Sequence, residues 1–348
     1  MNQDRPKFET HSSNSSSRLN PVLAFVVPCY NEEEALAATI PAILAFLDAL
    51  SESRQCSAAS YAILVDDGSI DGTWEAIIRA KAKNPEQIVG IRLATNAGHQ
   101  YALVAGIDYA AFNADISVSI DADMQHDLNA VPEMIRDYSS GSEIVLGIKR
   151  RRASDTALKR WTASRFYKIM QIMGVNIEDQ HADFRLMSSF AMRSLGKFPE
   201  YHLFLRGFPH LLHKRVTRVY YDVAPRNGGA SKYSIGRMLS LAWNGITSFS
   251  VVPLRVITIV GAVVFVLSAI LALGSVLTRI GGEAVPGWAS ITAPLYSLGG
   301  LLMLSIGIVG EYVGKIFVEV KRRPRYIVDS LMADHSNIEF VQFLSKDE

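Results

Sequence analysis

Two long apolar runs most constrain the fold of this chain. Each extends over 22 residues without a charged side chain, at Val256–Leu277 and Ala289–Gly310. An α-helix rises about 1.5 Å per residue, so roughly 20 apolar residues cross the hydrocarbon core of a bilayer. Two buried helices of a soluble core are the alternative, but buried helices seldom stay free of charge over such a length. The sequence therefore predicts two membrane-spanning helices.

The residues around the two runs predict a helical hairpin whose ends both face the cytoplasm. The connection between the runs, Thr278–Trp288, is short and holds three glycines and one proline. The basic residues that gather outside the runs are Arg255, Lys315, Lys321, Arg322, Arg323 and Arg325. Positively charged segments stay on the cytoplasmic side of a membrane. We therefore expect a multi-pass protein of the inner (plasma) membrane, with the N-terminal 250 residues and the C-terminal tail in the cytoplasm.

Charge and cysteine content exclude several classes of protein. The 35 lysines and arginines nearly balance the 34 aspartates and glutamates, so no overall positive field favours nucleic acid as a partner. The two cysteines, Cys29 and Cys56, are too few for a disulfide framework and form no C-x-x-C pair, which excludes a zinc ribbon. The serine-rich segment Met1–Asn20 lacks the apolar stretch of a signal peptide and is predicted to be a disordered tail.

The segment before the first apolar run is intermediate in polarity. Ser234–Val252 has apolar residues at helical spacing, interrupted by Arg237 and Asn244. This pattern favours a helix that lies in the membrane interface, and an amphipathic helix packed on the globular domain is the alternative. The predicted organisation is a tail (1–20), a cytoplasmic domain (21–232), an interfacial helix (233–252), a transmembrane hairpin (253–314) and a basic cytoplasmic tail (315–348).

Short apolar runs alternate with helical stretches through the cytoplasmic domain. The runs predicted to be strands are Val22–Val27, Tyr61–Val65, Ile88–Leu93, Ile116–Ile120 and Ile144–Ile148. The stretches predicted to be helices are Glu32–Ser51, Gly72–Lys83, Gly98–Phe112 and Ala130–Tyr138. Strands that are apolar throughout, with helices between them, indicate an α/β domain with a mostly parallel sheet covered on both faces. Ligands of such sheets bind beyond the carboxyl ends of the strands.

Polar clusters follow three of the predicted strands. They are Pro28–Glu32, Asp66–Thr73 and Asp121–His126. Because they follow strands of one sheet, we expect them to converge on one site. The chain has no G-x-G-x-x-G, P-loop or H-E-x-x-H motif, so oxidoreductases, P-loop kinases and zincins lose their main support.

Asp121 and Asp123 stand two residues apart at the end of the fourth predicted strand. Residues at this spacing share a face of an extended backbone, and two carboxylates on one face repel unless a cation lies between them. Mg²⁺ or Mn²⁺ suits these oxygens together with the amide oxygen of Gln125. Since Mg²⁺ commonly shares substrate phosphates, a diphosphate is the expected ligand. Capping of the next helix is the alternative role for the two aspartates.

Nine sequence blocks between Pro21 and Val328 form a combination that is typical of one protein family. They are VVPCYNEEE, VDDGSIDGT, NAGHQYALVAG, IDADMQH, DFRLMSS, FLRGF, RNGGASKYS, GITSFSVVPLR and GEYVGKIFVEVKRRPRY. With them the chain resembles the family 2 glycosyltransferases, more narrowly the bacterial polyprenyl-phosphate glycosyltransferases, which are similar to bactoprenol glucosyltransferases and dolichol-phosphate mannose synthase. The resemblance implies a nucleotide-diphospho-sugar domain of the glycosyltransferase A type. It also implies transfer of a sugar from a nucleotide sugar, with UDP-hexose such as UDP-glucose favoured, to undecaprenyl phosphate.

The resemblance implies roles for individual residues. Those expected to bind the nucleotide sugar are Pro28, Tyr30, Glu32, Val65, Asp67, Asp121, Ala122, Asp123 and Arg150. Those expected to bind the acceptor phosphate are Arg206, Arg226 and Lys232, and those expected to hold the metal are Asp121, Asp123 and Gln125. The residues assigned to catalysis are Asp121, Asp123, Asp183 and Arg206. Pairing with Arg185 or capping of a turn is the alternative role for Asp183.

A lipid phosphate acceptor needs little or no general base, because a phosphate monoester already carries roughly −1.5 to −2 charge at pH 7. It needs positive charge that brings it against an anionic donor, which arginine and lysine supply. The family implies a single in-line displacement with inversion. His99 and His126 are expected to begin a helix or to support the site rather than to act directly in catalysis.

The alternatives to this function differ in what they would make. A processive polysaccharide synthase is disfavoured, because the Q-x-x-R-W signature is absent and two spans are few for a polymer channel. A non-catalytic membrane component that binds a nucleotide sugar and a nucleotidyltransferase are further alternatives. The resemblance also suggests a homo-oligomer packed through the membrane region and a product used for a cell-envelope glycan.

Overall fold

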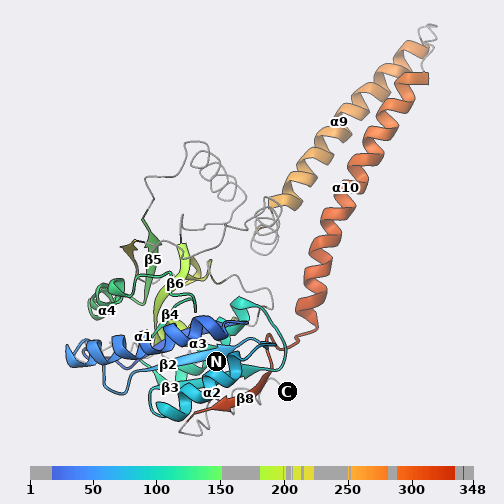
Figure 1. Cartoon of the computed structure of the whole chain (residues 1–348). Helices are drawn as coiled ribbons and strands as arrows, with labels where there is room; N and C mark the ends of the chain where they lie inside the picture. Colours follow the sequence, from blue (N-terminus) through green and yellow to red (C-terminus); the bar gives the residue numbers. More distant parts are fainter. Residues whose placement is uncertain are drawn as a thin grey trace, which may run out of the picture.

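The computed structural model describes residues 18–150, 181–198, 200, 205, 207–212, 215–222, 250, 252–280, 288–333 and 340. Its centre is an eight-stranded sheet of order β7-β5-β6-β4-β1-β2-β3-β8 (Figure 1). The strands are β1 (Leu23–Cys29), β2 (Tyr61–Asp66), β3 (Ile88–Leu93), β4 (Ile116–Ser119), β5 (Ile144–Lys149), β6 (His181–Ser188), β7 (Val216–Tyr221) and β8 (Val328–Met332). Four of the neighbouring pairs are parallel, and the pairs β3–β8, β4–β6 and β5–β6 are antiparallel. The predicted α/β fold with a mostly parallel sheet is confirmed.

Helices cover both faces of the sheet. They are α1 (Glu33–Glu52), α2 (Thr73–Lys83), α3 (His99–Asn113), α4 (Val131–Ser139), α6 (Ser189–Leu195) and the short α7 (Phe208–Leu211), with a 3-10 turn η2 (Leu128–Ala130) before α4. The side chains of α1, α2 and α4 pack with alternate residues of β1, such as Phe25, on one face. Those of α3 and α6 pack with the other set, such as Val26, on the opposite face. This is why every residue of β1 and β2 is buried and why these strands are apolar throughout.

Helix α3 lies close against the sheet at Gly106. A Cβ atom at this position would lie 2.4 Å from Cγ1 of Val26. Glycine therefore lets α3 lie directly on β1 and β2, and this close packing fixes where the first turn of α3 meets the carboxyl edge of the sheet.

The two predicted spans lie within two long helices, α9 (Val252–Ile280) and α10 (Trp288–Val320). Figure 1 shows them side by side as a hairpin that extends away from the sheet. The hydroxyl of Tyr312 on α10 donates to the carbonyl of Ser250, just before α9, at 2.5 Å. Many apolar side chains of both helices are exposed, including Ile259 and Ile316 at 63% and 60%. The predicted interfacial helix (233–252) and N-terminal tail (1–20) lie almost entirely outside the described residues.

Two helices among the described residues are long and apolar enough to cross a membrane by length and composition. One is α1, but its buried side chains pack against the sheet, so it is a core helix of the globular domain. The other is the Leu301–Val320 part of α10, none of which is buried. A shorter apolar stretch, Val252–Val264, belongs to α9.

The chain returns to the sheet after α10. Strand β8 pairs with β3 in antiparallel register, and the amide of Ala94 donates to the carbonyl of Ile327 at 2.9 Å. Further along, Phe340 is fully buried, with its ring edge-on to Tyr109 of α3 at 5.2 Å between centroids. The segment predicted from sequence as a basic tail thus also contributes a strand, β8, at the edge of the sheet.

Candidate active site

The three polar clusters lie at one edge of the sheet. Strands β4, β1 and β2 are neighbours and parallel, so their carboxyl ends point the same way. Asp121, Tyr30 and Asp67 follow those ends directly. Strand β6 runs antiparallel to β4, with Ser119 opposite Arg185, and this pairing brings Asp183 from β6 next to Asp121. The topology thus gathers side chains from four separate parts of the sequence.

Two histidines lie against the carboxylate of Asp121. His99, the first residue of α3, places Nε2 3.7 Å from Oδ1 of Asp121 and 3.4 Å from Oδ2 of Asp183. His126, five residues after Asp121 in the same loop, places Nε2 3.6 Å from Oδ2 of Asp121. Sequence analysis assigned His99 and His126 only supporting roles. Their proximity to the carboxylates depends on how α3 and the loop after β4 pack. The sequence offered one indication for His99, which follows strand β3 at the start of the next helix.

His126 is buried, whereas Asp121 is partly open to solvent, with side-chain exposures of 1% and 40%. Its ring stacks on Phe184 at 4.9 Å between centroids, with 12° between the ring planes, and meets Tyr221 edge-on at 5.8 Å. Burial lowers the pKa of His126, against the opposing effect of Asp121, so the neutral ring is favoured near pH 7. Burial also raises the pKa of Tyr221, which keeps that phenol protonated.

The carboxylate of Asp183 is bound by the buried guanidinium of Arg185. Nη2 of Arg185 lies 3.0 Å from Oδ1 of Asp183, and Nη1 donates to the carbonyl of Leu205 at 2.6 Å. The hydroxyl of Ser119 donates to the backbone carbonyl of Asp183 at 2.6 Å. The pairing with Arg185, weighed above as an alternative role for Asp183, is present, and it directs Oδ2 of Asp183 towards His99.

Comparison with known proteins adds to this geometry. Residues 24–196 match the family described as glycosyl transferase family 2. The chain is 35% identical over 308 residues to the prophage bactoprenol glucosyl transferase homolog of Escherichia coli K12, covering 88% of this chain and 98% of that protein. The chain belongs to glycosyl transferase family 2. This family 2 glycosyltransferase is also 43% identical over 309 residues to the uncharacterized glycosyltransferase YkoT of Bacillus subtilis, covering 89% and 91% of the two chains.

One solved structure to which the chain is similar is the mannosyltransferase PcManGT from Pyrobaculum calidifontis in complex with GDP-Man and Mn²⁺. It aligns with 87% of this glycosyltransferase and 86% of its own chain, at 14% identity and a TM-score of 0.41. This likeness is too distant to transfer the role of any residue.

Asp123 and Gln125 are linked in the loop after β4. The side-chain amide of Gln125 donates to Oδ2 of Asp123 at 2.6 Å, and its backbone amide donates to Oδ1 at 3.2 Å. The intervening Met124 has a positive φ of 51°, which turns the loop back on itself. The side-chain oxygen of Gln125 takes no part in these bonds, so the loop offers carboxylate and amide oxygens as the glycosyltransferase's candidate metal ligands.

The donor atoms fit a divalent cation that is completed by substrate. Within the described part of the chain, no group of three or more His, Cys, Asp or Glu side chains could hold a metal ion by itself. Mg²⁺ typically binds one or two carboxylates and obtains its other ligands from water and substrate phosphates. Asp121, Asp123 and Gln125 offer such an incomplete oxygen set, and the buried Nε2 of His126, which has no hydrogen-bond partner among the described residues, lies 3.6 Å from Oδ2 of Asp121.

The residues expected to bind the nucleotide sit in two kinds of surroundings. Tyr30 is 45% exposed at the end of β1, as a residue that stacks on a base must be. Asp67 is buried, and its carboxylate accepts from the amides of Ala97 at 2.7 Å and Gly98 at 2.9 Å, at the start of α3. Burial raises the pKa of Asp67, against the effect of these two amides. Asp67 therefore fastens the loop that leads to His99.

Glu32, Pro28, Val65 and Ala122 complete the predicted donor side. Burial, and next the charge of Asp123, raise the pKa of Glu32, so Glu32 lies close enough to the acidic loop to feel its charge. Pro28 and Val65 are paired with each other near the carboxyl ends of β1 and β2, and both are buried. The carbonyl of Ala122 accepts from the hydroxyl of Thr39 on α1 at 2.6 Å, which ties the acidic loop to that helix.

The predicted basic residues are only partly described. Arg150 follows β5, and its Nη1 lies 3.2 Å from Oδ2 of Asp222, with both side chains mostly exposed. Arg206, Arg226 and Lys232 lie outside the described residues.

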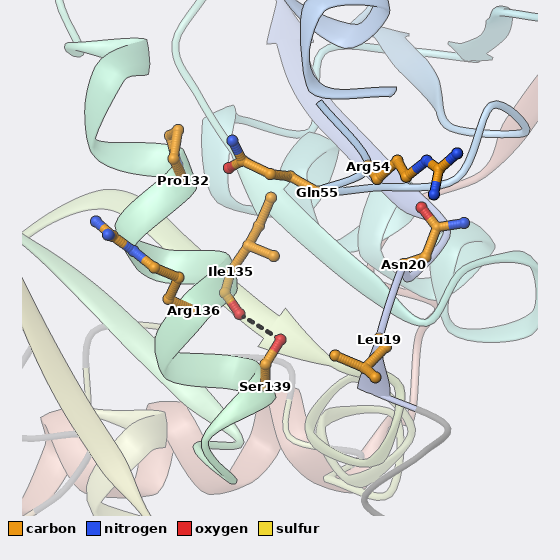
Figure 2. Close-up of a pocket in the computed structure, with 8 residues that line it drawn as sticks. All are labelled: Leu19, Asn20, Arg54, Gln55, Pro132, Ile135, Arg136 and Ser139. Carbon is orange, nitrogen blue, oxygen red and sulfur yellow. Dashed lines mark hydrogen bonds between the residues drawn. The ribbon is translucent and has the colours of Figure 1, made fainter. Parts of the chain in front are cut away.

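A surface pocket of about 410 Å³ lies elsewhere on the domain (Figure 2). Its lining includes Leu19 and Asn20 before β1, Arg54 and Gln55 after α1, and Arg136 on α4. Residues before β1 and after α1 lie at the amino edge of the parallel strands. The pocket is therefore on the side of the sheet opposite the acidic cluster and contains none of the predicted site residues.

Proposed function

We propose that this glycosyltransferase moves a single sugar, with inversion, from a nucleotide-diphosphate sugar to polyprenyl phosphate at the cytoplasmic face of the inner membrane. One observation carries the proposal: Asp121 and Asp183 converge on an open edge of the sheet in a chain 35% identical to a protein named a bactoprenol glucosyl transferase homolog. A UDP-hexose is the favoured donor.

The donor would lie across the carboxyl ends of β1, β2 and β4. Tyr30 and Glu32 face the position of the base and ribose, and Asp67 shapes that side through the loop before α3. Asp121, Asp123 and Gln125 would hold Mg²⁺ or Mn²⁺ against the diphosphate. When bound, the cation would offset the charge that develops on the departing nucleoside diphosphate.

The acceptor needs no strong base in this chain. Its phosphate is largely ionised at pH 7, so binding and orientation are the main tasks of the protein. Asp183, held by Arg185, would orient the sugar or the acceptor, and Arg206, Arg226 and Lys232 would bind the acceptor phosphate. Arg150 would contact the donor diphosphate after release from Asp222.

The nature of the acceptor and the two helices α9 and α10 support a membrane position. A polyprenyl chain stays in the bilayer, so its phosphate must be reached at the membrane surface. The exposed apolar side chains of α9 and α10 support burial of the hairpin in lipid, where leaving them in water would be costly. The basic residues after α10 support a cytoplasmic catalytic domain, and a homo-oligomer is part of the same proposal.

The test is transfer by the purified full-length protein in lipid nanodiscs. The reaction contains undecaprenyl phosphate, Mg²⁺ or Mn²⁺ and one of a panel of radiolabelled nucleotide sugars. We expect one labelled sugar per lipid phosphate, loss of transfer with a chelator, and loss in Asp123→Asn. Asp127→Asn is the matched control, because Asp127 lies in the same loop but its carboxylate accepts from the amide of Asn129 at 3.0 Å.

Other outcomes would identify a different protein. A polymeric product on mass spectrometry would indicate a processive synthase, and consumption of a nucleoside triphosphate would indicate a nucleotidyltransferase. Donor binding without transfer to any acceptor, together with a cellular function that survives Asp123→Ala, would indicate a non-catalytic component.

A further inference from the structure

His126 contacts Asp121 at two points, one on the backbone and one on the side chain. The backbone amide of Asp121 donates to Nδ1 of His126 at 3.3 Å. On the other side of the ring, Nε2 lies 3.6 Å from Oδ2 of the same aspartate. One buried ring thus lies against both the amide and the carboxylate of a residue in the acidic cluster.

The first contact determines where the proton of the neutral ring resides. A nitrogen that accepts a hydrogen bond carries no hydrogen, so Nδ1 is bare and Nε2 carries the N–H. That N–H is buried and has no hydrogen-bond partner within the described part of the chain. A closing movement of a few tenths of an ångström would bring Oδ2 of Asp121 within hydrogen-bonding distance of it.

The ring has no freedom to turn away from Asp121. It is stacked on Phe184 at 4.9 Å and bounded by Tyr221 at 5.8 Å, and those two rings meet edge-on at 5.0 Å. Phe184 is the residue next to Asp183 on β6, so the stack joins the loop after β4, which carries Asp121 and His126, to the strand that carries Asp183. The orientation of the ring is therefore fixed by packing, independently of its contacts to Asp121.

We infer that His126 is a positioning residue that sets the side-chain orientation of Asp121 for the donor-bound cation, through an acceptor at Nδ1 and a donor at Nε2. The inference rests on the proposed function, in which Asp121 is a metal ligand. Groups that orient a metal ligand by hydrogen bonding commonly change metal affinity by about 10- to 100-fold when they are removed. His126 makes no contact with substrate in this role.

Three substitutions separate the two contacts. His126→Phe retains an aromatic ring for the stack and removes both nitrogen contacts. His126→Asn places an acceptor near the position of Nδ1 but reaches no further, and His126→Gln places a donor near the position of Nε2. Ile77→Val is the control for stability, because Ile77 is fully buried in α2 and distant from the acidic cluster.

The measurement is the dissociation constant of Mn²⁺ alone, from electron paramagnetic resonance of the full-length protein in nanodiscs, alongside the midpoint of thermal unfolding. We expect His126→Phe to weaken Mn²⁺ binding by about 10- to 100-fold. His126→Asn and His126→Gln should each give a smaller loss. Ile77→Val should lower the unfolding midpoint and leave the Mn²⁺ dissociation constant unchanged. If His126→Phe fails to fold, the Asn and Gln variants decide the question.

A second readout requires no metal. Nitrogen-15 spectra of metal-free protein labelled at histidine should show His126 with its proton on Nε2. A proton on Nδ1, or wild-type Mn²⁺ affinity in all three variants while Asp121→Asn loses it, would overturn the inference. If the wild type and Asp121→Asn bind Mn²⁺ equally, the metal assignment of the proposed function fails, and that failure is distinct from failure of the role of His126.

Discussion

The hydroxyl of Tyr326 donates to Oδ2 of Asp108 at 2.8 Å and thereby joins the segment after α10 to the middle of α3. Asp108 is buried, and α3 begins with His99 at the acidic cluster. The same segment is bonded to the sheet through β8 and β3. The chain that returns from the helical hairpin thus supports the helix that carries a site residue.

Tyr326→Phe should destabilise the domain, because it removes only the hydroxyl that bonds to Asp108. A hydrogen bond within a protein contributes about 0.5–1.5 kcal/mol, so we expect a loss of that size in the free energy of unfolding, read as a lower thermal midpoint in detergent. Tyr220→Phe is the matched control, because Tyr220 is 54% exposed on β7 and its change should stay within about 0.5 kcal/mol. Equal stability of the two variants would contradict the prediction.

Truncation after Val320 should prevent stable folding even though every predicted site residue remains. It removes β8, which leaves one edge of β3 unpaired while the other edge stays paired with β2, and it removes the buried ring of Phe340. An uncovered strand edge promotes aggregation. Size-exclusion chromatography should show aggregates for this chain and a well-behaved species for a chain truncated after Phe340. A monodisperse, cooperatively unfolding product of the shorter truncation would show that β8 is dispensable.

Arg185→Lys should impair turnover more than donor binding. Lysine cannot reach both Asp183 and the carbonyl of Leu205 as the guanidinium does, so the orientation of Asp183 is lost while the charge remains. Loss of one charge-assisted bond, about 1.5–3 kcal/mol, corresponds to roughly a 10- to 100-fold lower kcat. Donor KM should change little. Arg193→Lys is the control, because Nε of Arg193 on α6 donates to the carbonyl of Ala111 at 3.1 Å, so the same exchange removes an arginine hydrogen bond outside the acidic cluster. An unchanged kcat in Arg185→Lys would exclude the positioning role of Arg185.

The stability of the domain should depend on pH through Asp67. Burial raises its native pKa above the ordinary 3.8, so the native state keeps this proton to a higher pH than the unfolded chain does. Its contribution to stability is then fully present below about pH 4 and is lost as the pH rises through the native pKa. The difference in unfolding free energy, wild type minus Asp67→Asn, should therefore fall from pH 4 to pH 7. A difference that increases with pH would mean that the amides of Ala97 and Gly98 outweigh burial.

Sequence patterns predicted the first half of the domain closely. Strands β1 to β5 lie within two residues of their predicted bounds, because fully buried strands between polar clusters leave little ambiguity. Strand β6 was not predicted, because Asp183 and Arg185 make it polar and only its pairing buries them. Strand β8 was not predicted either, because its partner β3 lies more than 200 residues earlier in the chain.

The acidic side of the site could be predicted for a similar reason. Asp121, Asp123 and Asp67 directly follow predicted strands, so the topology of a parallel sheet was enough to place them together. The contacts of His99 and His126 could not be predicted, because they depend on the packing of α3 and of three aromatic rings. The basic residues Arg206, Arg226 and Lys232 stay predictions.

The position of β8 at the far end of the chain has a consequence for synthesis. Ribosomes synthesise the chain from its amino end, so β3 cannot pair with β8 until α9 and α10 have been made. The sheet is therefore completed only after the hairpin has emerged. A ribosome that stalls within α10 would release an incomplete domain in which the unpaired edge of β3 can aggregate.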